Sequence, residues 1–281
     1  MKTLIQKIHL DNHESFACRT YTTPNFETNW HVHEEYELIL ITQGNGTALI
    51  GDYVNEYRKG DVYFLAGNLP HWFRKSNPKI IGSAIVIHFT KGIFENGFIN
   101  TPELSKINRL LNQQNGLLLK KKLKLLITDY ILKINESSSF ERMILLLTCL
   151  QKISNDNQFD TITKDFSDSK NNVNQTIESV IEYTFKNFKN PITLSEIAMT
   201  AKMTIPTFCR FFKRNIKKSY FDFLQEVRIS HACKLLNSTN KSVMSICYES
   251  GYNSWSHFSK QFKAVKKMTP SLYRKKYSNE M

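Results

Sequence analysis

The sequence predicts an α+β protein of two domains, with strands in the first third of the chain and helices in the rest. Strand-like segments separated by glycine turns fill residues 15–90, whereas apolar residues after about residue 100 recur with a helical period. The length of 281 residues exceeds that of one typical compact core. We therefore expect a small N-terminal β-barrel or sandwich with following helices, and an all-α C-terminal domain.

Short antiparallel strands are expected to build the N-terminal domain over residues 1–100. Apolar and β-branched residues predict strands at 36–42, 47–50, 53–57, 61–65 and 83–89. Gly51 and Asp52 separate the second and third of these segments, which is a strong hairpin signal. Short strands at close, regular spacing favour a barrel or a sandwich.

Residues 101–154 are expected to form a helical segment. Pro102 follows Thr101, which suits the first turn of a helix and its N-cap. Leucine-rich stripes predict helices at 117–134 and 140–153, and these stripes must pack against another surface. Residues 155–174 are polar and rich in Asn, Asp, Ser and Lys, and this composition predicts a flexible linker.

The composition is that of a soluble globular protein, with 41% hydrophobic and 22% charged residues. No apolar run approaches the roughly 20 residues that a membrane span needs, and the N-terminus has no apolar core of a secretory signal. We expect no membrane partner and a cytoplasmic location. Five scattered cysteines without a CxxC pair predict reduced thiols rather than disulfides or a zinc site: Cys18, Cys149, Cys209, Cys233 and Cys247.

Positive charge is concentrated at the C-terminal end. The net charge is +13, and residues 174–281 contain 18 Lys and Arg against 7 Asp and Glu. Such asymmetry indicates a polyanionic partner for this segment, nucleic acid or an anionic membrane surface; a solvated basic face is the alternative.

An internal repeat with an offset of about 50 residues marks this basic segment. The matched pairs are Thr204 and Ser254, Phe208 and Phe258, Arg210 and Lys260, Phe212 and Phe262, and Lys213 and Lys263. Two related helical units in tandem explain these pairs.

Each repeat has the pattern of a helix-turn-helix. In the first, Thr193 and Glu196 form a capping box, residues 201–203 make the turn, and Thr204 caps a helix over 205–215. In the second, Ser242 caps the first helix, a turn begins at Gly251, and a helix covers 255–265. A connecting helix over 221–236 can hold the two reading helices about one DNA turn, roughly 34 Å, apart.

A long motif near the C-terminal end consists of Ile246–Cys247, Gly251–Tyr252, Ser254, Ser256, Phe258, Lys260, Phe262–Lys263, Met268–Pro270 and Tyr273–Arg274. This motif resembles the C-terminal signature of the AraC/XylS family of transcription regulators. The resemblance implies a DNA-binding domain over residues 175–279. By this resemblance, base-reading or groove positions are occupied by Pro206, Cys209, Arg210, Ser256, Ser259 and Lys260. The full set expected to contact DNA adds Thr204, Lys213, Lys217, Ser254, Trp255, Lys263 and Lys267.

The chain departs from the family pattern at three lysines. The family has glycine after each reading helix, where Lys217 and Lys267 stand here. Each lysine is expected either to adopt a left-handed conformation or to end the helix differently, and to contact the phosphate backbone. Lys260 stands where the family has arginine, and lysine lacks the planar fork that reads guanine. Pro206 and Cys209 read bases poorly by hydrogen bonding, so Arg210 is expected to dominate in the first unit.

The N-terminal strands carry a second resemblance. His31, His33, Glu37 and Gly44, and then Gly60, Asp61 and His71, have the spacing of the two cupin motifs. The resemblance implies a cupin-like barrel that holds a small-molecule effector, followed by helices that form a homodimer; packing of these helices on their own barrel is the alternative. The expected pocket residues are Trp30, His31, His33, Tyr36, Glu37, Tyr63, His71 and Trp72, and the aromatic members can instead be core residues.

In metal-bearing cupins the positions of His31, His33, Glu37 and His71 are metal ligands. Imidazole and carboxylate groups suit zinc, iron, manganese or nickel. In regulators, these polar positions often persist without an ion, so no metal and no cofactor are expected here.

The leading hypothesis is a sequence-specific DNA-binding transcription regulator, an effector-controlled activator that contacts DNA and RNA polymerase and is bound to the bacterial nucleoid in action. A metal-dependent cupin enzyme with a DNA-binding tail is one alternative, and an effector-independent DNA-binding protein is another. No enzymatic activity is expected, because no general acid/base pair stands out beyond the candidate ligands.

Overall fold

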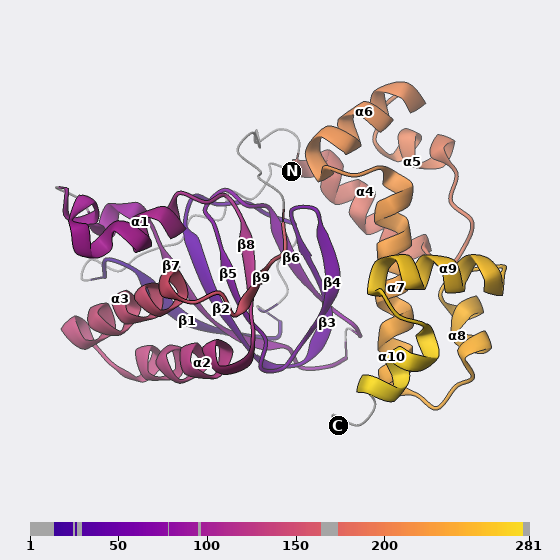
Figure 1. Ribbon diagram of the computed structural model, residues 1–281. Helices are drawn as coiled ribbons and strands as arrows, with labels where there is room; N and C mark the ends of the chain where they lie inside the picture. Colours follow the sequence, from indigo (N-terminus) through magenta and orange to yellow (C-terminus); the bar gives the residue numbers. More distant parts are fainter. Residues whose placement is uncertain are drawn as a thin grey trace. The chain divides into compact units, whose positions relative to one another are not determined.

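The computed structural model describes residues 14–24, 26, 30–77, 79–94, 97–163 and 174–277. These residues form two compact units that divide near residue 170, drawn in indigo to magenta and in orange to yellow in Figure 1. Among the described residues, no helix is long and apolar enough to cross a membrane. All five cysteines are free thiols, as predicted.

Two antiparallel sheets form the N-terminal unit. Their strands are β1 (Ala17–Thr22), β2 (Tyr36–Gln43), β3 (Asn45–Ile50), β4 (Tyr53–Arg58), β5 (Val62–Leu65), β6 (His71–Lys75), β7 (Ser83–Phe89), β8 (Gly116–Leu119) and β9 (Phe159–Thr161). The larger sheet has the order β1-β7-β2-β5-β8-β9 and the smaller one β4-β3-β6. The hairpin predicted at Gly51 is present, and Gly51 has a φ of 52°.

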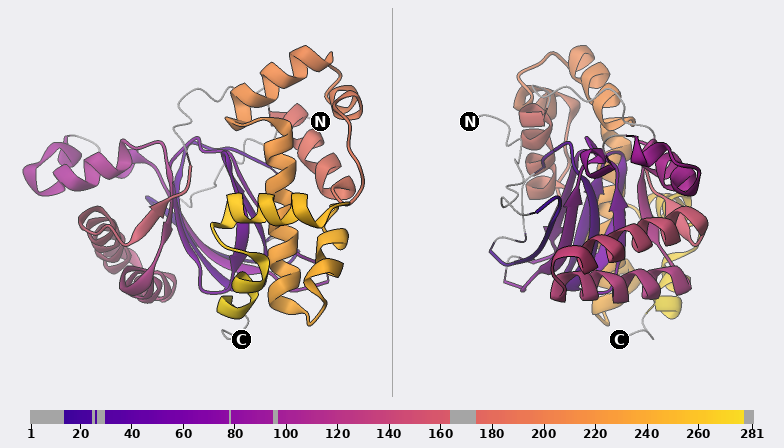
Figure 2. Two further views of the ribbon diagram at one scale, coloured as in Figure 1. Left: turned by 45° about the vertical axis from the view of Figure 1, so that its right-hand side comes forward. Right: turned by 90° about the vertical axis from the view of Figure 1, so that its left-hand side faces the viewer.

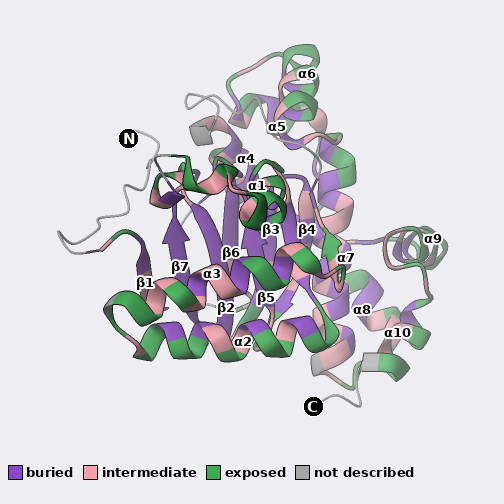
Figure 3. Cartoon of the chain, turned by 60° about the vertical axis from the view of Figure 1, so that its left-hand side comes forward, coloured by how far each residue is buried: buried purple, intermediate pink, exposed green. Residues whose placement is uncertain are grey.

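Side chains alternate between the two faces of the larger sheet, as strand geometry requires. On β2, Ile39 and Ile41 face inward and pack with Phe73 of the smaller sheet, so the two sheets enclose a common interior. Leu38 and Leu40 point to the opposite face, where helices cover them. Both faces of the central strands are therefore buried, as the purple colour of the strands in Figure 3 shows.

Helices cover the outer face of the larger sheet. They are α1 (Ser105–Leu111), α2 (Lys121–Glu136) and α3 (Ser139–Asn155), preceded by the 3-10 turns η1 (Lys91–Phe94), η2 (Phe98–Asn100) and η3 (Pro102–Leu104). Figure 2 shows α2 and α3 side by side against this sheet. Ile127 and Ile131 of α2 and Leu146 and Leu150 of α3 share one buried cluster with the sheet. Packing on the same chain, the alternative left open by the sequence, thus accounts for one face of each helix.

The predicted boundaries of the N-terminal domains are wrong in two places. Residues 117–119 were expected at the start of a helix, but they belong to β8, and α2 begins only at Lys121. Residues 159–161, expected in the linker, form β9, which pairs with β8. The sheet therefore extends beyond residue 100, and residues 164–173 of the predicted linker lie outside the described residues.

Helices alone make up the described part of the C-terminal unit from residue 174 onward. They are α4 (Asn174–Asn187), α5 (Leu194–Thr200), α6 (Ile205–Ile216), α7 (Tyr220–Ser238), α8 (Val243–Glu249), α9 (Trp255–Lys266) and α10 (Pro270–Tyr277). Figure 1 shows α6 near one end of α7, and α8, α9 and α10 beside its other half. The predicted connecting helix is thus α7, which at about 1.5 Å per residue is roughly 28 Å long.

Aromatic side chains fix both repeats to α7. The Phe212 ring of α6 lies 5.6 Å from that of Phe223, centroid to centroid. In the second repeat, Phe258 and Phe262 are fully buried in a cluster with Ala232 of α7. The helix that joins the repeats is therefore also the core element that holds each of them.

Candidate nucleic-acid interface and N-terminal pocket

The first helix-turn-helix is formed by α5 and α6. Thr193 and Glu196 make the predicted capping box: the Glu196 carboxylate accepts the Thr193 N–H at 2.7 Å, and the Thr193 hydroxyl accepts the Glu196 N–H at 3.2 Å. The turn contains Lys202 at a φ of 54°. Thr204 stands at the N-cap position of α6, but its hydroxyl donates to Thr207 and makes no capping bond.

The second helix-turn-helix is formed by α8 and α9. Ser242 caps α8, and Ser254 caps α9 by accepting the His257 N–H. Gly251 occupies the turn with a φ of 84°. A Cβ atom at Gly251 would lie 2.5 Å from the Phe188 carbonyl oxygen, so the turn needs glycine for close approach as well as for its φ.

The two reading helices correspond residue by residue. α6 covers 205–216 and α9 covers 255–266, and both end at a lysine in the left-handed conformation, Lys217 at 58° and Lys267 at 57°. Of the two endings considered for these lysines, the left-handed one is therefore present in both repeats. The inward residues Phe208 and Phe258 also match, and both are fully buried.

The residues predicted to contact DNA lie on the outer side of the repeats. Most are exposed, and only Lys217 and Ser259 are half-buried; the exposed ones are Thr204, Pro206, Cys209, Arg210, Lys213, Ser254, Trp255, Ser256, Lys260, Lys263 and Lys267. Because Phe212 and Phe262 point inward, Arg210 and Lys260 face away from the core. Each repeat thus presents an exposed helix face with basic side chains.

Three exposed residues on the same faces were not predicted. Arg214 lies one helical turn beyond Arg210, and Thr207 and His257 occupy equivalent places in the first turns of α6 and α9. A helical-wheel count from the buried phenylalanines would have found all three. The family signature did not identify them, because it rests on other positions.

Arg228 of α7 ties the second repeat to the chain before the first. Its Nε donates to the Phe188 carbonyl at 2.7 Å, and its Nη2 donates to the Asn190 carbonyl at 2.9 Å. Its guanidinium also lies 5.7 Å from the centre of the Tyr252 ring. These contacts hold α7, the segment after α4 and the turn of the second unit in one arrangement.

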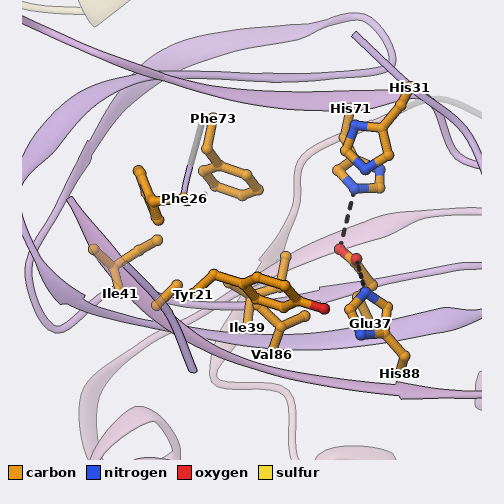
Figure 4. A pocket seen from close by; sticks show the side chains of 11 residues that line it. Tyr21, Phe26, His31, Glu37, Ile39, Ile41, His71, Phe73, Val86 and His88 are labelled. Atoms are coloured by element: carbon orange, nitrogen blue, oxygen red, sulfur yellow. Dashed lines mark ion pairs between the residues drawn. The ribbon is translucent and has the colours of Figure 1, made fainter. Parts of the chain in front are cut away.

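A pocket lies inside the N-terminal unit, between its two sheets. It is lined by Tyr21, Phe26, His31, Glu37, Ile39, Ile41, His71, Phe73, Ala84, Val86 and His88. Figure 4 shows His31, His71 and His88 turned toward Glu37 at one end, and Phe26, Phe73 and Ile41 at the other. The pocket therefore has a polar end and an apolar end.

Glu37 is the centre of the polar end. Its Oε1 lies 3.1 Å from His33 Nε2 and 2.6 Å from His88 Nε2, and its Oε2 lies 3.1 Å from His71 Nε2. Sheet register explains one of these contacts, since Glu37 of β2 stands directly opposite His88 of β7. All of these side chains are buried.

Electrostatic coupling within this cluster is strong. Burial opposes a charge on His33, but the Glu37 carboxylate and hydrogen bonds to Glu35 and Glu37 raise the pKa of His33 to about 10. Burial also opposes a charge on Glu37, yet the nearby His71, His88 and His33 hold the pKa of Glu37 well below its usual range. Without another ligand, Glu37 is thus an anion at neutral pH and His33 a cation.

Sequence reasoning located this pocket only in part. His31, Glu37 and His71 line it as expected, and His33 contacts it through Glu37. Tyr36 was wrongly assigned, because strand alternation places it on the opposite face, where its hydroxyl donates to the Leu111 carbonyl.

The other three aromatic residues predicted for the pocket, Trp30, Tyr63 and Trp72, are buried but do not line it. They are core residues, which was the alternative prediction for the aromatic members of this set. The lining residues that were not predicted come mostly from β2 and β7. Both faces of these strands are buried, so only the direction in which a side chain points separates a pocket residue from a core residue. The missed His88 lies outside both cupin motifs, and only the pairing of β2 with β7 brings it to Glu37.

Two family models match the chain, one in each unit. The AraC-like ligand binding domain matches residues 14–84, and the helix-turn-helix domain matches residues 197–276. The chain belongs to the AraC family of transcription regulators. The match to the AraC-like ligand binding domain covers β1 to β6 and the start of β7, and the helix-turn-helix match covers both reading helices.

Curated relatives of this AraC-family chain are transcription regulators. The chain is 25% identical over 259 residues to the regulator YdeC of Bacillus subtilis, covering 87% of this chain and 85% of the relative. It is 24% identical over 266 residues to the lactose operon transcription activator of Staphylococcus xylosus, covering 91% and 89%. Over 90 residues it is 38% identical to a regulator of Haemophilus influenzae, covering 32% and 30%. The chain is thus similar to DNA-binding regulators along most of its length.

Proposed function

We propose that the protein recognises a specific DNA sequence by placing α6 and α9 in two adjacent major grooves on one face of the duplex. The observation that carries the proposal is the pair of matching exposed helix faces, with Arg210 of α6 and Lys260 of α9 at equivalent positions. Both helices pack on α7. A recognition helix enters the major groove with its N-terminal half, where these residues stand.

Contacts to bases and to phosphates are divided along each helix. Arg210 is the strongest candidate for bidentate contact with guanine, and Lys260 offers a weaker, point-charge contact. Lys213 and Lys263, one turn later, and the terminal Lys217 and Lys267 lie where phosphates flank the groove. This division predicts that α6 discriminates more strongly between bases than α9 does.

Control of DNA binding by a small molecule is the second part of the proposal. The pocket between the sheets combines a polar end with an apolar end, which is the usual chemistry of a ligand site. Its free space of about 50 Å³ holds roughly three or four water-sized groups, so the effector is small or opens the pocket on binding. Binding there would shift the population of states in which the reading helices can engage DNA.

A homodimer that activates transcription completes the proposal. Helices α2 and α3 each bury one face on the sheet, yet they leave large apolar side chains exposed: Leu125 (69%), Leu132 (43%), Phe140 (76%) and Ile144 (44%). A second copy of the chain would cover them and pair two half-sites. The activators among the relatives support activation, which requires a contact with RNA polymerase.

The test compares the protein with two alanine variants on one selected DNA site and on random DNA. Arg210→Ala and Lys260→Ala should each cost about 1–3 kcal/mol on the selected site and relax its specificity. Lys133→Ala, which removes one exposed lysine from α2, is the matched control and should bind like the unmodified protein. Equal losses on selected and random DNA would reduce Arg210 and Lys260 to phosphate contacts and would overturn the base-reading proposal.

A further inference from the structure

We propose that Arg228 sets the position of α9 relative to α6 and thereby determines which spacing of the two DNA segments the protein accepts. This role rests on the proposed recognition of DNA by two reading helices. Arg228 stands near the middle of α7. The first repeat packs on the half of α7 before it, through Phe223, and the second repeat packs on the half after it, through Ala232. Arg228 therefore lies where the cores of the two repeats meet.

The guanidinium of Arg228 binds the end of α4. Its Nε donates to the Phe188 carbonyl at 2.7 Å, and its Nη2 donates to the Asn190 carbonyl at 2.9 Å. Because α4 ends at Asn187, both acceptors follow its last turn, where a positive charge is favourable. The planar fork of arginine fixes both contacts at once, which the flexible point charge of a lysine does not.

The same contacts reach the turn of the second repeat. The Arg228 guanidinium lies 5.7 Å from the centre of the buried Tyr252 ring. A Cβ atom at Gly251 would lie 2.5 Å from the Phe188 carbonyl oxygen and 3.0 Å from Arg228 Nε, so the turn is closely packed against both groups. This turn leads into Ser254, the N-cap of α9. A displacement of the turn would therefore move the start of the second reading helix.

A ring contact holds the segment after α4 against the next turn of α7. The rings of Phe188 and His231 lie 5.0 Å apart, centroid to centroid, and Phe188 is buried. His231 is three residues after Arg228, so the two residues share one face of α7. The end of α4, the middle of α7 and the turn between α8 and α9 thus contact one another in all three pairs.

A fixed relation between the reading helices matters because the two DNA segments also have a fixed relation. One extra base pair between them shifts the second segment by about 3.4 Å and turns it by about 35° around the duplex axis. Helices held in one arrangement accept one spacing. A loosened pair binds with a lower effective concentration and tolerates other spacings. Arg228 is therefore a positioning residue, which acts on recognition without contacting the DNA.

The first measurement is the distance between α6 and α9 in the full-length protein without DNA. Nitroxide labels on Cys209 of α6 and on α9 after Ser256→Cys report it by double electron–electron resonance, and Cys18→Ser removes the other partly exposed thiol. Dilution with unlabelled protein excludes distances between copies. We expect one narrow distribution for otherwise unmodified protein and a broader one for Arg228→Lys, which keeps the charge but loses the fork.

Thr184→Ala is the matched control. The Thr184 hydroxyl is buried in the first repeat, 3.0 Å from that of Tyr220, so its loss lowers stability without affecting the second repeat. The control should keep the narrow distribution. Circular dichroism shows whether each variant is folded, and Arg228→Gln replaces Arg228→Lys if the latter is not. Equal widths in the folded Arg228 variant and the unmodified protein would overturn the proposal.

The functional measurement compares three DNA fragments. They are the selected site, the same site with one base pair inserted between its two segments, and a site with one segment scrambled. The insertion should weaken the unmodified protein at least about tenfold, because one repeat loses its base contacts. Arg228→Lys should bind the selected site about tenfold more weakly, lose less than about threefold on insertion, and bind the scrambled site like the unmodified protein.

Failure of this role is distinguishable from failure of recognition by two helices. An unmodified protein that is insensitive to the inserted base pair would overturn both. A normal insertion penalty that persists in Arg228→Lys would overturn the role of Arg228 alone. Equal losses on all three fragments would do the same, because a residue that only supports the fold, or that contacts DNA itself, affects every fragment alike.

Discussion

Lys267 combines two opposing physical effects in one residue. It ends α9 with a φ of 57°, where a residue with a Cβ atom is strained by about 1–2 kcal/mol. Its exposed ammonium lies at the end of the reading helix, where a phosphate is expected. The family pattern has glycine at this position, and this chain has a charge instead.

Lys267→Gly should therefore stabilise the protein and weaken its DNA binding. We expect the free energy of unfolding to rise by up to about 1 kcal/mol. The slope of log affinity against log salt should become shallower by about 0.9 if one phosphate contact is lost. Urea unfolding and anisotropy titrations over a range of salt measure the two effects. Unchanged salt dependence would show that Lys267 does not contact the backbone.

His231 of α7 makes stability depend on pH. Burial, together with the positive charges of Lys189, Lys234 and Lys241, lowers the pKa of His231 to about 4, and Glu249 opposes this only partly. Its ring lies against Phe188, 5.0 Å between centroids. The folded protein thus resists protonation that the unfolded chain accepts near pH 6.5.

Stability should consequently fall as pH drops from about 6.5 to about 4, because over this range the unfolded chain binds a proton that the folded one does not. The contribution of His231 is on the order of 2 kcal/mol across the range. Urea midpoints of the protein and of His231→Gln between pH 7 and pH 4 test this. The midpoint of the unmodified protein should fall relative to that of the variant as the pH drops. A constant difference would contradict the assignment.

At the scale of elements, prediction from sequence succeeded where a motif was specific to one type of structure. It failed where the same composition fits both a helix and a strand. The capping box at Thr193 and the repeat of Phe208 as Phe258 located α5, α6 and α9 to within about a residue. The apolar run at 117–119 was assigned to a helix, because a short buried strand and a buried helical turn have the same composition. β9 exists through its pairing with β8, which local sequence does not encode.

The residues of the pocket were likewise predicted only in part. Its motif residues His31, Glu37 and His71 were found because their spacing is characteristic. His88 and Tyr21 were not found, because they come from β7 and β1, and only the register of the sheet places them beside Glu37 and its neighbours. Long-range strand pairing was thus the information that the sequence patterns lacked.

Helices α2 and α3 support a specific prediction about assembly. Leu125 and Leu132 are seven residues apart on α2, and Phe140 and Ile144 are four apart on α3, so each pair lies on one helix face. Leu125→Glu combined with Phe140→Glu should convert a dimer into a monomer, because both charges would be buried without a partner.

Sedimentation equilibrium of the two proteins measures this change. Ile81→Glu, which alters a similarly exposed apolar residue in a loop of the same unit, is the matched control and should remain dimeric. A monomeric unmodified protein, or a dimer that survives the double change, would show that these faces do not form the interface.

At the scale of the whole molecule, the segment that carries most of the positive charge is also the one that contains the DNA-binding repeats. The pocket and the apolar helix faces lie in the N-terminal unit, whereas the repeats lie in the segment that carries most of the net charge of +13. A polyanion is therefore attracted chiefly to the reading helices. Phosphate contacts provide affinity that depends on salt, and the first turns of α6 and α9 provide the choice of sequence.

The most direct measurement is a footprint of the full-length protein on its best genomic fragment, chosen by selection at physiological salt. Recognition by two tandem helices in a dimer predicts paired half-sites on one face of the duplex, each protected in two adjacent major grooves about one turn apart. Arg210→Ala should remove the protection in one groove of each half-site and leave the other largely intact. Weak protection without a preferred sequence, or a half-site with a single protected groove, would contradict recognition by two tandem helices.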